Sequence, residues 1–302
     1  MNTHSDEVAL EFPLFFRIYK DGRIERFAGT DTTPPGTDAR TGVQSKDVII
    51  DQETGVSARL YLPKTTSTSS TGKLPLLIYI HGGAFCICSP FNRTYHEHVN
   101  SVVHEGNVVV VSVNYRLAPE HPLPIAYDDS WAAVQWAASH SKGSGPEPWL
   151  NDHADFGRVY LAGDSAGANL SHNMAVRAAA DGLDGVKLAG LVLIHPFFGN
   201  NKRDPLLDYL FPTMDKSGDP RIEAAEDPKL STVACSKVLV MVAENDFLRD
   251  RGLTYYEALK KSGWGGRADM VEAEGENHVF HLSNPNGEKA AALLKQFVSF
   301  MG

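Results

Sequence analysis

The stretch that decides the fold is GDSAG at residues 163–167, a G-x-S-x-G pattern. An apolar run at residues 158–162 leads into it, and a helical pattern leads out of it over residues 166–181. A serine on a sharp turn between a buried strand and a helix is a nucleophile elbow. Because glycines flank the turn, the backbone can adopt the strained conformation that exposes the hydroxyl of Ser165. The pattern therefore predicts a reactive serine at the end of a strand.

The surrounding chain alternates short apolar runs with helical patterns. We expect strands at residues 46–50, 56–62, 74–80, 108–113, 159–162, 191–194, 238–242 and 268–271. We expect helices at residues 94–105, 127–140, 166–181, 253–262 and 288–300. Apolar strands separated by helices are typical of a parallel sheet that is covered on both faces. The sequence thus predicts a single α/β domain over residues 1–302, with a mostly parallel central sheet.

Two segments fall outside this alternation. Residues 1–42 precede the sheet and contain several phenylalanines, and residues 200–234 are polar and proline-rich. We expect the first to form an N-terminal cap and the second a short lid over a site, with irregular surface excursions as the alternative. Residues 65–72, TTSTSSTG, are expected to form a flexible surface turn between two strands.

Composition excludes several classes of protein. The chain has 302 residues, with 28 Lys+Arg against 37 Asp+Glu and a net charge of −9. Nucleic acids and anionic membranes attract basic surfaces, so neither is expected as a partner. The longest apolar runs, at residues 74–80 and 108–113, are far shorter than the roughly 18 residues that a membrane-spanning helix needs.

The cysteines indicate the compartment. There are three, Cys86, Cys88 and Cys235, and an odd, sparse set suits a reducing environment. Cys86 and Cys88 lack the spacing and the second pair of a zinc site, so no metal is expected. The first residues are polar and acidic and do not resemble a secretory signal. We therefore expect a cytoplasmic location, with the nucleus as an additional compartment.

A serine nucleophile needs a base, and the base needs an orienting acid. In hydrolases built around an elbow, the acid and then the histidine follow the serine along the chain. Asp246 follows the expected strand at 238–242, and His278 follows the one at 268–271. Since sites in parallel sheets lie at the carboxyl ends of the strands, we expect Ser165, Asp246 and His278 to form a catalytic triad.

Three nearby residues compete for these roles. His281 lies three residues after His278 and is the alternative base, with a packed surface histidine as its structural interpretation. Glu244 comes very soon after its strand. Asp250 is expected to begin the next helix, where a carboxylate complements the helix dipole.

An oxyanion that develops on the substrate needs aligned donors, usually backbone amides. The sequence HGGAF at residues 81–85 follows an apolar strand and resembles a known type of oxyanion loop. We expect the amides of Gly82 and Gly83, together with that of Ala166 after the nucleophile, to be the donors. His81 is expected to be a structural residue that forms hydrogen bonds.

Aromatic and apolar residues near these motifs are candidates for the walls of a substrate pocket. The candidates are Phe15, Phe16, Phe85, Phe197, Phe198, Tyr209, Phe247 and Val279. Plain core packing is the alternative for each of them, because aromatic residues at sheet edges usually pack.

Together these motifs resemble the plant carboxylesterases of the hormone-sensitive-lipase-like branch of the α/β-hydrolases. The resemblance extends over nearly the whole chain, at residues 18–26, 81–85, 114–122, 163–167, 246–252, 262–264 and 277–281. It implies an α/β-hydrolase fold and a serine carboxylesterase that acts on small carboxylic esters without a cofactor. The implied partner is a small-molecule ester, and the implied assembly is a monomer or a weak homo-oligomer.

The same group is similar to 2-hydroxyisoflavanone dehydratase, to alkaloid cyclases and to the gibberellin receptor, in which the catalytic histidine position is lost. Because Ser165, Asp246 and His278 are all present here, a receptor is disfavoured. A dehydratase or cyclase acting on a flavonoid or alkaloid can retain the triad and use His278 as a base, so it stays open as the alternative. One departure from the group is a short lid, residues 200–218, which predicts a more open or differently roofed pocket.

Overall fold

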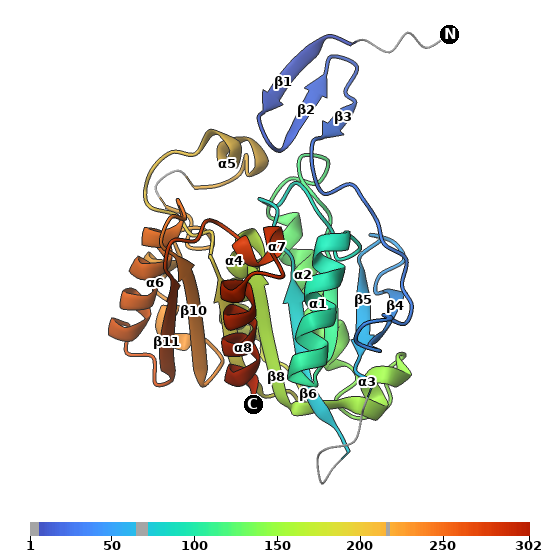
Figure 1. The fold of residues 1–302 in the computed structure, drawn as a ribbon. Coiled ribbons are helices and arrows are strands. Elements are labelled where there is room, and N and C mark those ends of the chain that lie inside the picture. The colour runs from blue at the N-terminus through green and yellow to red at the C-terminus, as the bar shows by residue number, and fades with distance from the viewer. Residues whose placement is uncertain (1–5, 65–71, 216–217) are drawn as a thin grey trace.

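The computed structural model describes residues 6–64, 72–215 and 218–302. Its centre is an eight-stranded sheet of order β11-β10-β9-β8-β6-β7-β5-β4 (Figure 1). The strands are β4 (Gln44–Ile49), β5 (Ser57–Leu62), β6 (Leu74–Ile80), β7 (Val109–Asn114), β8 (Ala154–Asp164), β9 (Leu188–Ile194), β10 (Lys237–Ala243) and β11 (Arg267–Ala273). Apart from Gly72, the turn expected at residues 65–72 lies outside the described residues.

The expected mostly parallel sheet is confirmed. Strands β6 to β11 pair in parallel, and only β4 and β5, at one edge, run antiparallel to their neighbours. Each expected strand is present within a few residues of its predicted bounds. The main difference is β8, which begins at Ala154 and not at residue 159. The sequence did not show its first half because polar Asp155 and Arg158 interrupt the apolar pattern there.

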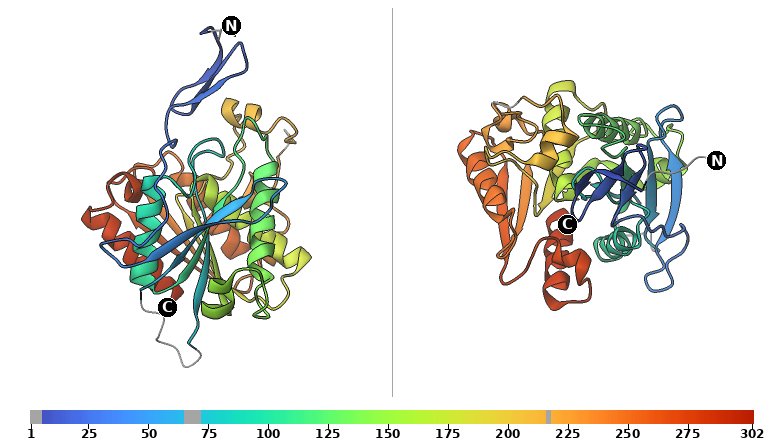
Figure 2. Two further views of the ribbon diagram at one scale, coloured as in Figure 1. Left: turned by 90° about the vertical axis from the view of Figure 1, so that its right-hand side faces the viewer. Right: turned by 90° about the horizontal axis from the view of Figure 1, so that it is seen from above.

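Helices cover both faces of the sheet, as Figure 2 shows from above. One face carries α1 (Arg93–Gly106) and α8 (Glu288–Met301), which pack against each other. The other face carries α2 (Ile125–Ala138), α4 (Ala166–Asp181) and α6 (Arg249–Lys261). Three shorter helices are α3 (Pro148–His153), α5 (Pro205–Leu210) and α7 (Phe280–Ser283).

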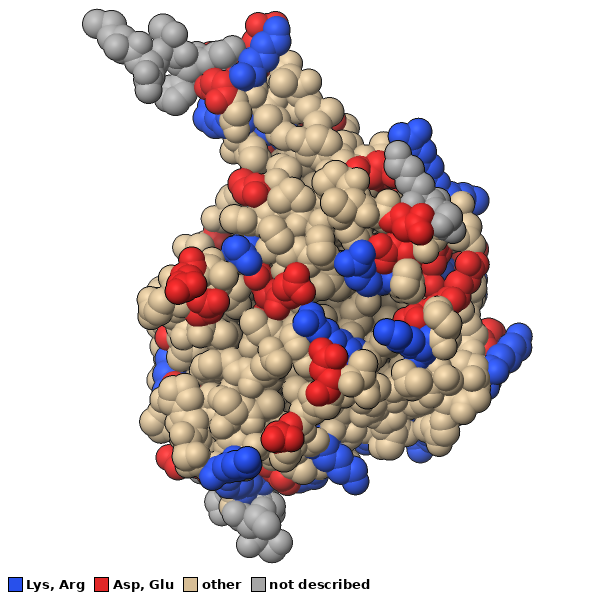
Figure 3. Space-filling view, turned by 180° about the vertical axis from the view of Figure 1, so that it is seen from behind, with Lys and Arg blue, Asp and Glu red and all other residues tan. Residues whose placement is uncertain are grey.

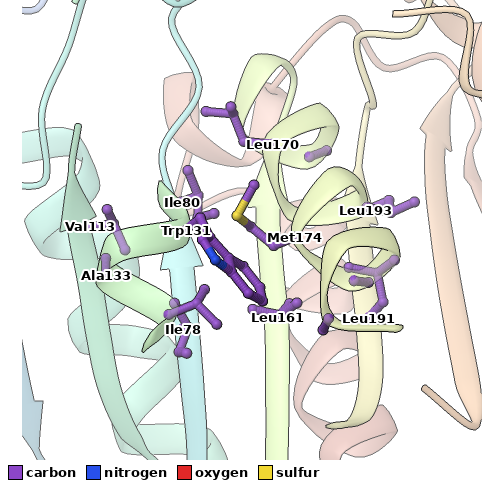
Figure 4. Close-up of a cluster of buried hydrophobic side chains, with 14 of the residues drawn as sticks. Ile78, Ile80, Val113, Trp131, Ala133, Leu161, Leu170, Met174, Leu191 and Leu193 are labelled. Carbon is purple, nitrogen blue, oxygen red and sulfur yellow. The ribbon is translucent and has the colours of Figure 1, made fainter. Parts of the chain in front are cut away.

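Side-chain alternation along the central strands builds a core on each face. In β6, Ile78 and Ile80 point to the α2–α4 face, whereas Leu77 and Tyr79 point to the α1–α8 face. Figure 4 shows the first of these cores, where the indole of Trp131 lies among apolar side chains from β6, β8 and α4. Burying an aliphatic side chain of this size contributes about 1.5–3 kcal/mol. The two cores hold the carboxyl ends of the strands in register.

Part of the segment predicted to be a cap, residues 1–42, forms a separate three-stranded antiparallel sheet. Its strands are β1 (Val8–Phe12), β2 (Phe16–Tyr19) and β3 (Ile24–Arg26). The small sheet stands above the carboxyl ends of the main sheet, beside α5 (Figures 1 and 2). The sequence predicted no strands here, because runs of three to five residues are too short to show a clear period of two.

Residues 200–234 form α5 and two short 3₁₀ turns, η1 (Ala224–Glu226) and η2 (Leu230–Thr232). The helix begins with Asp204, whose carboxylate accepts hydrogen bonds from the N–H groups of Leu206 and Leu207, and with Pro205 in its first turn. The capping carboxylate of Asp204 and the proline in the first turn explain how so short a helix forms within a polar, irregular segment.

The surface carries both signs of charge. On the face opposite that of Figure 1, acidic and basic side chains are interspersed and neither sign forms a continuous field (Figure 3). No helix in the described part of the chain is both long enough and apolar enough to cross a membrane.

Candidate active site

The elbow is built by the end of β8 and the start of α4. Ser165 lies between them with φ 52° and ψ −119°, a backbone conformation that residues other than glycine rarely adopt. A Cβ on Gly163 would lie 2.4 Å from the carbonyl oxygen of Ile80, and a Cβ on Gly167 would lie 2.0 Å from the same atom. Both positions therefore require glycine, because the end of β6 approaches the turn closely. The tight packing holds Ser165 in its strained conformation.

The structure brings Ser165, His278 and Asp246 into one line of hydrogen bonds. The Nε2 atom of His278 lies 3.0 Å from Oγ of Ser165, and its Nδ1 atom lies 2.8 Å from Oδ2 of Asp246. Asp246 is buried and also accepts the N–H of Leu248 at 2.8 Å. With an ionised carboxylate on Nδ1, the neutral imidazole carries its proton there and presents Nε2 to the hydroxyl. This geometry suits proton transfer from serine to histidine.

The competing residues lie elsewhere. His281 is buried next to His98, neither of its ring nitrogens has a hydrogen-bond partner among the described residues, and burial drives its pKa well below the usual value. Asp250 lies in the first turn of α6, as expected, and pairs with Arg249. Glu244 accepts the N–H of Gly275 at 2.6 Å. Among the described residues, Asp246 has the only carboxylate bonded to His278.

His195 is a residue of the site that the sequence analysis missed. It follows β9 directly, and its Nδ1 atom accepts the N–H of Val279, the residue after His278, at 2.9 Å. Burial, and secondly the charge of His278, lower the pKa of His195 to about 4, so the ring is neutral at pH 7. It restrains the peptide that carries His278. Its position at the carboxyl end of an expected strand was the signal that could have identified it.

The expectation for Gly82 is corrected by the structure. Its N–H donates to Oη of Tyr95 at 2.9 Å and approaches Oδ1 of Asp164 at 3.3 Å, so it faces the interior and not a substrate. The carboxylate of Asp164 also accepts the hydroxyls of Tyr79 and Tyr95. These partners come from other elements, so the sequence of the loop alone could not reveal them.

The next two N–H groups of the loop, on Gly83 and Ala84, are the candidate oxyanion donors once Gly82 is set aside. The carbonyl of Gly82 is held by Nδ1 of His81 at 2.7 Å, and the carbonyl of Gly83 accepts the N–H groups of Cys86 and Ile87. In a trans peptide the N–H points opposite to the C=O. The N–H groups of Gly83 and Ala84 therefore point away from these bonded carbonyls, and both residues line the cavity. Neither donates a hydrogen bond to another group within the described ranges.

His81 is a structural residue, in agreement with its expected role. It is fully buried, and its ring stacks on Tyr115 with 4.3 Å between centroids. Burial lowers its pKa to about 4, so it is a neutral donor to the Gly82 carbonyl. The third expected donor, Ala166, is the first residue of α4, and N–H groups at this position have no partner within the helix.

Asp164, inside the pentapeptide, is a second residue whose role the sequence analysis missed. It is fully buried, and burial raises its pKa above the usual value although three donors stabilise the charged form. It links the elbow to β6 through Tyr79 and to α1 through Tyr95. An acidic residue within an otherwise small-residue turn was the available signal.

A cavity of about 700 Å³ opens above Ser165. Apolar side chains dominate its walls, and Leu14 and Phe247 at its mouth are largely exposed. Both segments expected to form a lid contribute to it, through Leu14 and Phe15 in the turn between β1 and β2 and through Leu206, Leu207 and Leu210 of α5. Five of the expected wall residues line it: Phe15, Phe85, Phe197, Phe247 and Val279.

The other three expected wall residues lie away from the cavity. Phe16 is fully buried beneath the small sheet, where it contacts the ring of Tyr209. Tyr209 of α5 is 41% exposed and faces the small sheet, with 5.5 Å between its ring centroid and that of Phe12. Phe198 stacks on Tyr255 in the core under α6, with 4.5 Å between ring centroids. Neighbouring aromatic residues alternate between pocket and core here, which no local pattern distinguishes.

The other reactive groups near the site are two thiols and a histidine–carboxylate cluster. Burial raises the pKa of the thiols of Cys86 and Cys88 to about 12, so neither competes with Ser165 as a nucleophile at neutral pH. Of the described residues, His195, Asp246 and His278 place possible metal-ligating atoms within 4.8 Å of one another. Asp246 and His278 already bind each other, and His195 accepts the Val279 amide, so hydrogen bonding accounts for this cluster.

Comparisons with known proteins point to one family. A family model described as the alpha/beta hydrolase fold matches residues 77–282. The chain is 46% identical to probable carboxylesterase 5 of Arabidopsis thaliana, over 98% of each chain. It is 43% identical to 2-hydroxyisoflavanone dehydratase of Glycyrrhiza echinata, over 99% of this chain and 98% of that one. An esterase of Pyrobaculum calidifontis superposes with a TM-score of 0.70 at 29% identity, over 85% of this chain and 84% of that one.

Proposed function

Because the chain belongs to the alpha/beta hydrolase fold family, we propose that it is a carboxylesterase that hydrolyses small carboxylic esters through an acyl-enzyme on Ser165. The expected resemblance to plant carboxylesterases is confirmed by the 46% identity to one of them. The observation that carries the mechanism is the line of hydrogen bonds from Ser165 through His278 to Asp246, at the floor of an apolar cavity.

Acylation begins when Oγ of Ser165 attacks the ester carbonyl and its proton passes to Nε2 of His278. Asp246 keeps the imidazole in the correct tautomer and stabilises the imidazolium. His278 then gives the proton to the leaving alcohol. In deacylation a water molecule attacks the acyl carbonyl while His278 accepts its proton; the bond to Oγ of Ser165 then breaks, His278 returns the proton to Oγ, and the carboxylic acid is released.

The negative charge that forms on the carbonyl oxygen is bound by the amides of Gly83, Ala84 and Ala166. Gly83 and Ala84 line the cavity, and Ala166 lies at the positive end of the α4 dipole. Removing one such donor typically raises the barrier by about 2.7–4 kcal/mol. Since these donors are aligned before the substrate arrives, they need no reorganisation during the reaction.

The cavity indicates the kind of substrate. A volume of about 700 Å³ with mainly apolar walls accommodates an ester with a medium-length acyl chain or an aromatic alcohol. We further propose that the protein acts in a reducing compartment such as the cytoplasm, because its three cysteines are free thiols. A lid role for the small sheet and α5 is supported by the residues that both contribute to the cavity.

The test is initial-rate hydrolysis of p-nitrophenyl acetate, butyrate and octanoate by the wild type and by Ser165→Ala. We expect turnover by the wild type and almost none by the variant, with butyrate or octanoate preferred to acetate. Ser89→Ala, in the loop before α1, is the matched control and should retain full activity. Wild-type turnover no faster than that of Ser165→Ala would overturn the proposal.

A dehydratase is the second candidate, because the chain is 43% identical to 2-hydroxyisoflavanone dehydratase over almost its whole length. In that reaction His278 would remove a proton from the substrate and Ser165 would only donate a hydrogen bond. Turnover of a 2-hydroxyisoflavanone that survives in Ser165→Ala would support this candidate. Loss of that turnover together with ester hydrolysis would favour the acyl-enzyme mechanism.

A further inference from the structure

Two sequence segments that the triad leaves unexplained, residues 18–26 and 114–122, meet at Arg26. This side chain ends β3 of the small sheet and is 17% exposed. Its Nε donates to the carbonyl oxygen of Cys86 at 2.7 Å, and its Nη2 donates to that of Ala118 at 3.1 Å. Both Nη atoms also bind the carboxylate of Glu120, Nη1 at 2.8 Å. Arg26 thus joins the small sheet to the loop that carries Gly83 and Ala84.

The carbonyl of Cys86 belongs to the first of two peptide groups that connect Arg26 to the oxyanion site. The N–H of the same peptide, on Ile87, donates to the carbonyl of Gly83 at 2.9 Å. The N–H of that second peptide, on Ala84, points away from this bonded carbonyl, and Ala84 lines the cavity. The guanidinium and the two peptide groups therefore form a head-to-tail hydrogen-bonded chain that ends at the proposed oxyanion donor. Such chains polarise each successive donor.

The loop needs an external restraint. Ala84, Phe85 and Cys88 all have positive φ values, of 49°, 62° and 74°, and each such residue stores strain. A second restraint comes from the segment at 114–122, because the N–H of Ala118 donates to the carbonyl of Phe85 at 3.0 Å. Arg26 binds the carbonyls of both Cys86 and Ala118, so it fixes the oxyanion loop to the segment at 114–122.

We propose that Arg26 is a positioning residue for the oxyanion site, and that the small N-terminal sheet serves catalysis as well as covering the cavity. The cation at the start of the peptide chain orients the Ala84 N–H toward the substrate oxygen and strengthens it as a donor. The effect is larger when that oxygen carries the negative charge of the tetrahedral intermediate than when it is a neutral carbonyl. Arg26 therefore favours the transition state over the bound ester. The inference rests on the proposed esterase function.

The first test is steady-state hydrolysis of p-nitrophenyl butyrate by Arg26→Met, Arg26→Lys and the wild type. The methionine variant keeps much of the aliphatic stem and loses the charge and the donors. We expect kcat to fall by about tenfold, less than for loss of an oxyanion donor itself, with KM within about twofold. The lysine variant keeps the charge but not the forked geometry, so we expect an intermediate kcat.

The matched control is Arg23→Met in the same small sheet. Arg23 lies over the ring of Tyr19 and pairs with Asp6, and it does not contact the oxyanion loop. We expect its kcat and KM to equal those of the wild type. If Arg26 served only to attach the sheet, its loss would raise KM or lower the melting temperature and leave kcat unchanged. That result would overturn the proposal, as would an equal loss of kcat in Arg23→Met.

The second test does not depend on turnover. Serine adds to trifluoromethyl hexyl ketone to give a charged tetrahedral adduct, whereas methyl hexyl ketone remains a neutral carbonyl ligand. We expect Arg26→Met and Arg26→Lys to weaken binding of the first ketone in proportion to kcat and to leave binding of the second unchanged. Equal binding of the fluorinated ketone by wild type and both variants would overturn the proposal for Arg26. Weak binding of that ketone already in the wild type would instead contradict the esterase function on which the proposal rests.

Discussion

The triad and the roof of the cavity are held in different ways. Ser165, Asp246 and His278 follow strands β8, β10 and β11, whose parallel neighbours set their positions. The roof, made of the small sheet and α5, lies off the main sheet and is attached by side chains, as in the hydrogen bonds of Arg26 with the carbonyls of Cys86 and Ala118. The triad is therefore on the part of the fold that the main sheet holds, and much of the cavity wall is on a part outside that sheet, which can vary more freely.

The comparison predicts that changes at the triad cause the largest losses. We expect Asp246→Asn to lower kcat by about ten-thousand-fold, because an amide stabilises the wrong tautomer of His278 and cannot stabilise its cation. Stopped-flow or spectrophotometric esterase assays measure this effect. Asp250→Asn, on the exposed side of α6, is the control and should retain activity. Comparable losses in both variants would mean that the acid had been assigned wrongly.

The second prediction concerns the stability of the elbow. Gly167→Ala would place a Cβ 2.0 Å from the carbonyl oxygen of Ile80, so the central strands must separate or the helix must move. We expect the free energy of unfolding to fall by about 3–5 kcal/mol, as for other severe overpacking. Urea denaturation followed by circular dichroism measures this change. Gly265→Ala is the control, since no atom lies within 4 Å of its Cβ position; equal stability of the two variants would contradict the argument.

The third prediction is a loss of stability in acid that depends on buried histidines under the site. His98 is buried against His281 of α7 and Tyr79 of β6, and burial lowers its pKa from 6.5 to about 4. Because the unfolded chain binds a proton between these values and the folded chain does not, its stabilising contribution is complete above pH 6.5 and is lost as the pH falls toward 4. The contribution of such a group is on the order of 3 kcal/mol.

Replacing His98 should therefore reduce the amount by which the free energy of unfolding falls at acidic pH. We expect the free energy of unfolding of His98→Phe to fall less between pH 7 and pH 4.5 than that of the wild type, in urea titrations at each pH. His153→Phe, at the end of α3 and remote from this cluster, provides the control for removing one histidine. An unchanged slope in His98→Phe would show that folding does not lower the pKa of His98 and would contradict the prediction.

The smallest effect is expected in the roof and at the mouth of the cavity. Phe247 is 73% exposed and its ring lies 5.1 Å from that of His278, so it covers one side of the site without supporting the core. We expect Phe247→Ala to raise KM for p-nitrophenyl octanoate by about three- to tenfold, from the loss of part of one aromatic contact, with little change in melting temperature. Phe27→Ala, which removes a side chain that is 40% exposed and is not among those lining the cavity, should change neither.

Sequence reasoning succeeded where a functional residue is tied to a local pattern. Ser165 lies between a strand and a helix that both show clear periodicity, and Asp246 and His278 follow apolar runs at the correct place in the chain order. It failed where neighbouring residues of one type face different surroundings. Phe197 lines the cavity and Phe198 is in the core, although both are large aromatic residues in one short loop.

By itself, the sequence predicted the α/β architecture, the mostly parallel sheet and the residues of the proposed triad, because each depends on strand, turn and helix patterns that are local in the chain. Only the tertiary structure decided which amides face the substrate. Gly82 donates to Tyr95 of α1, and the loop after it is held by Arg26 from a position 60 residues earlier. The direction of a peptide group depends on its hydrogen-bond partners, and here those partners come from distant elements that no local pattern specifies.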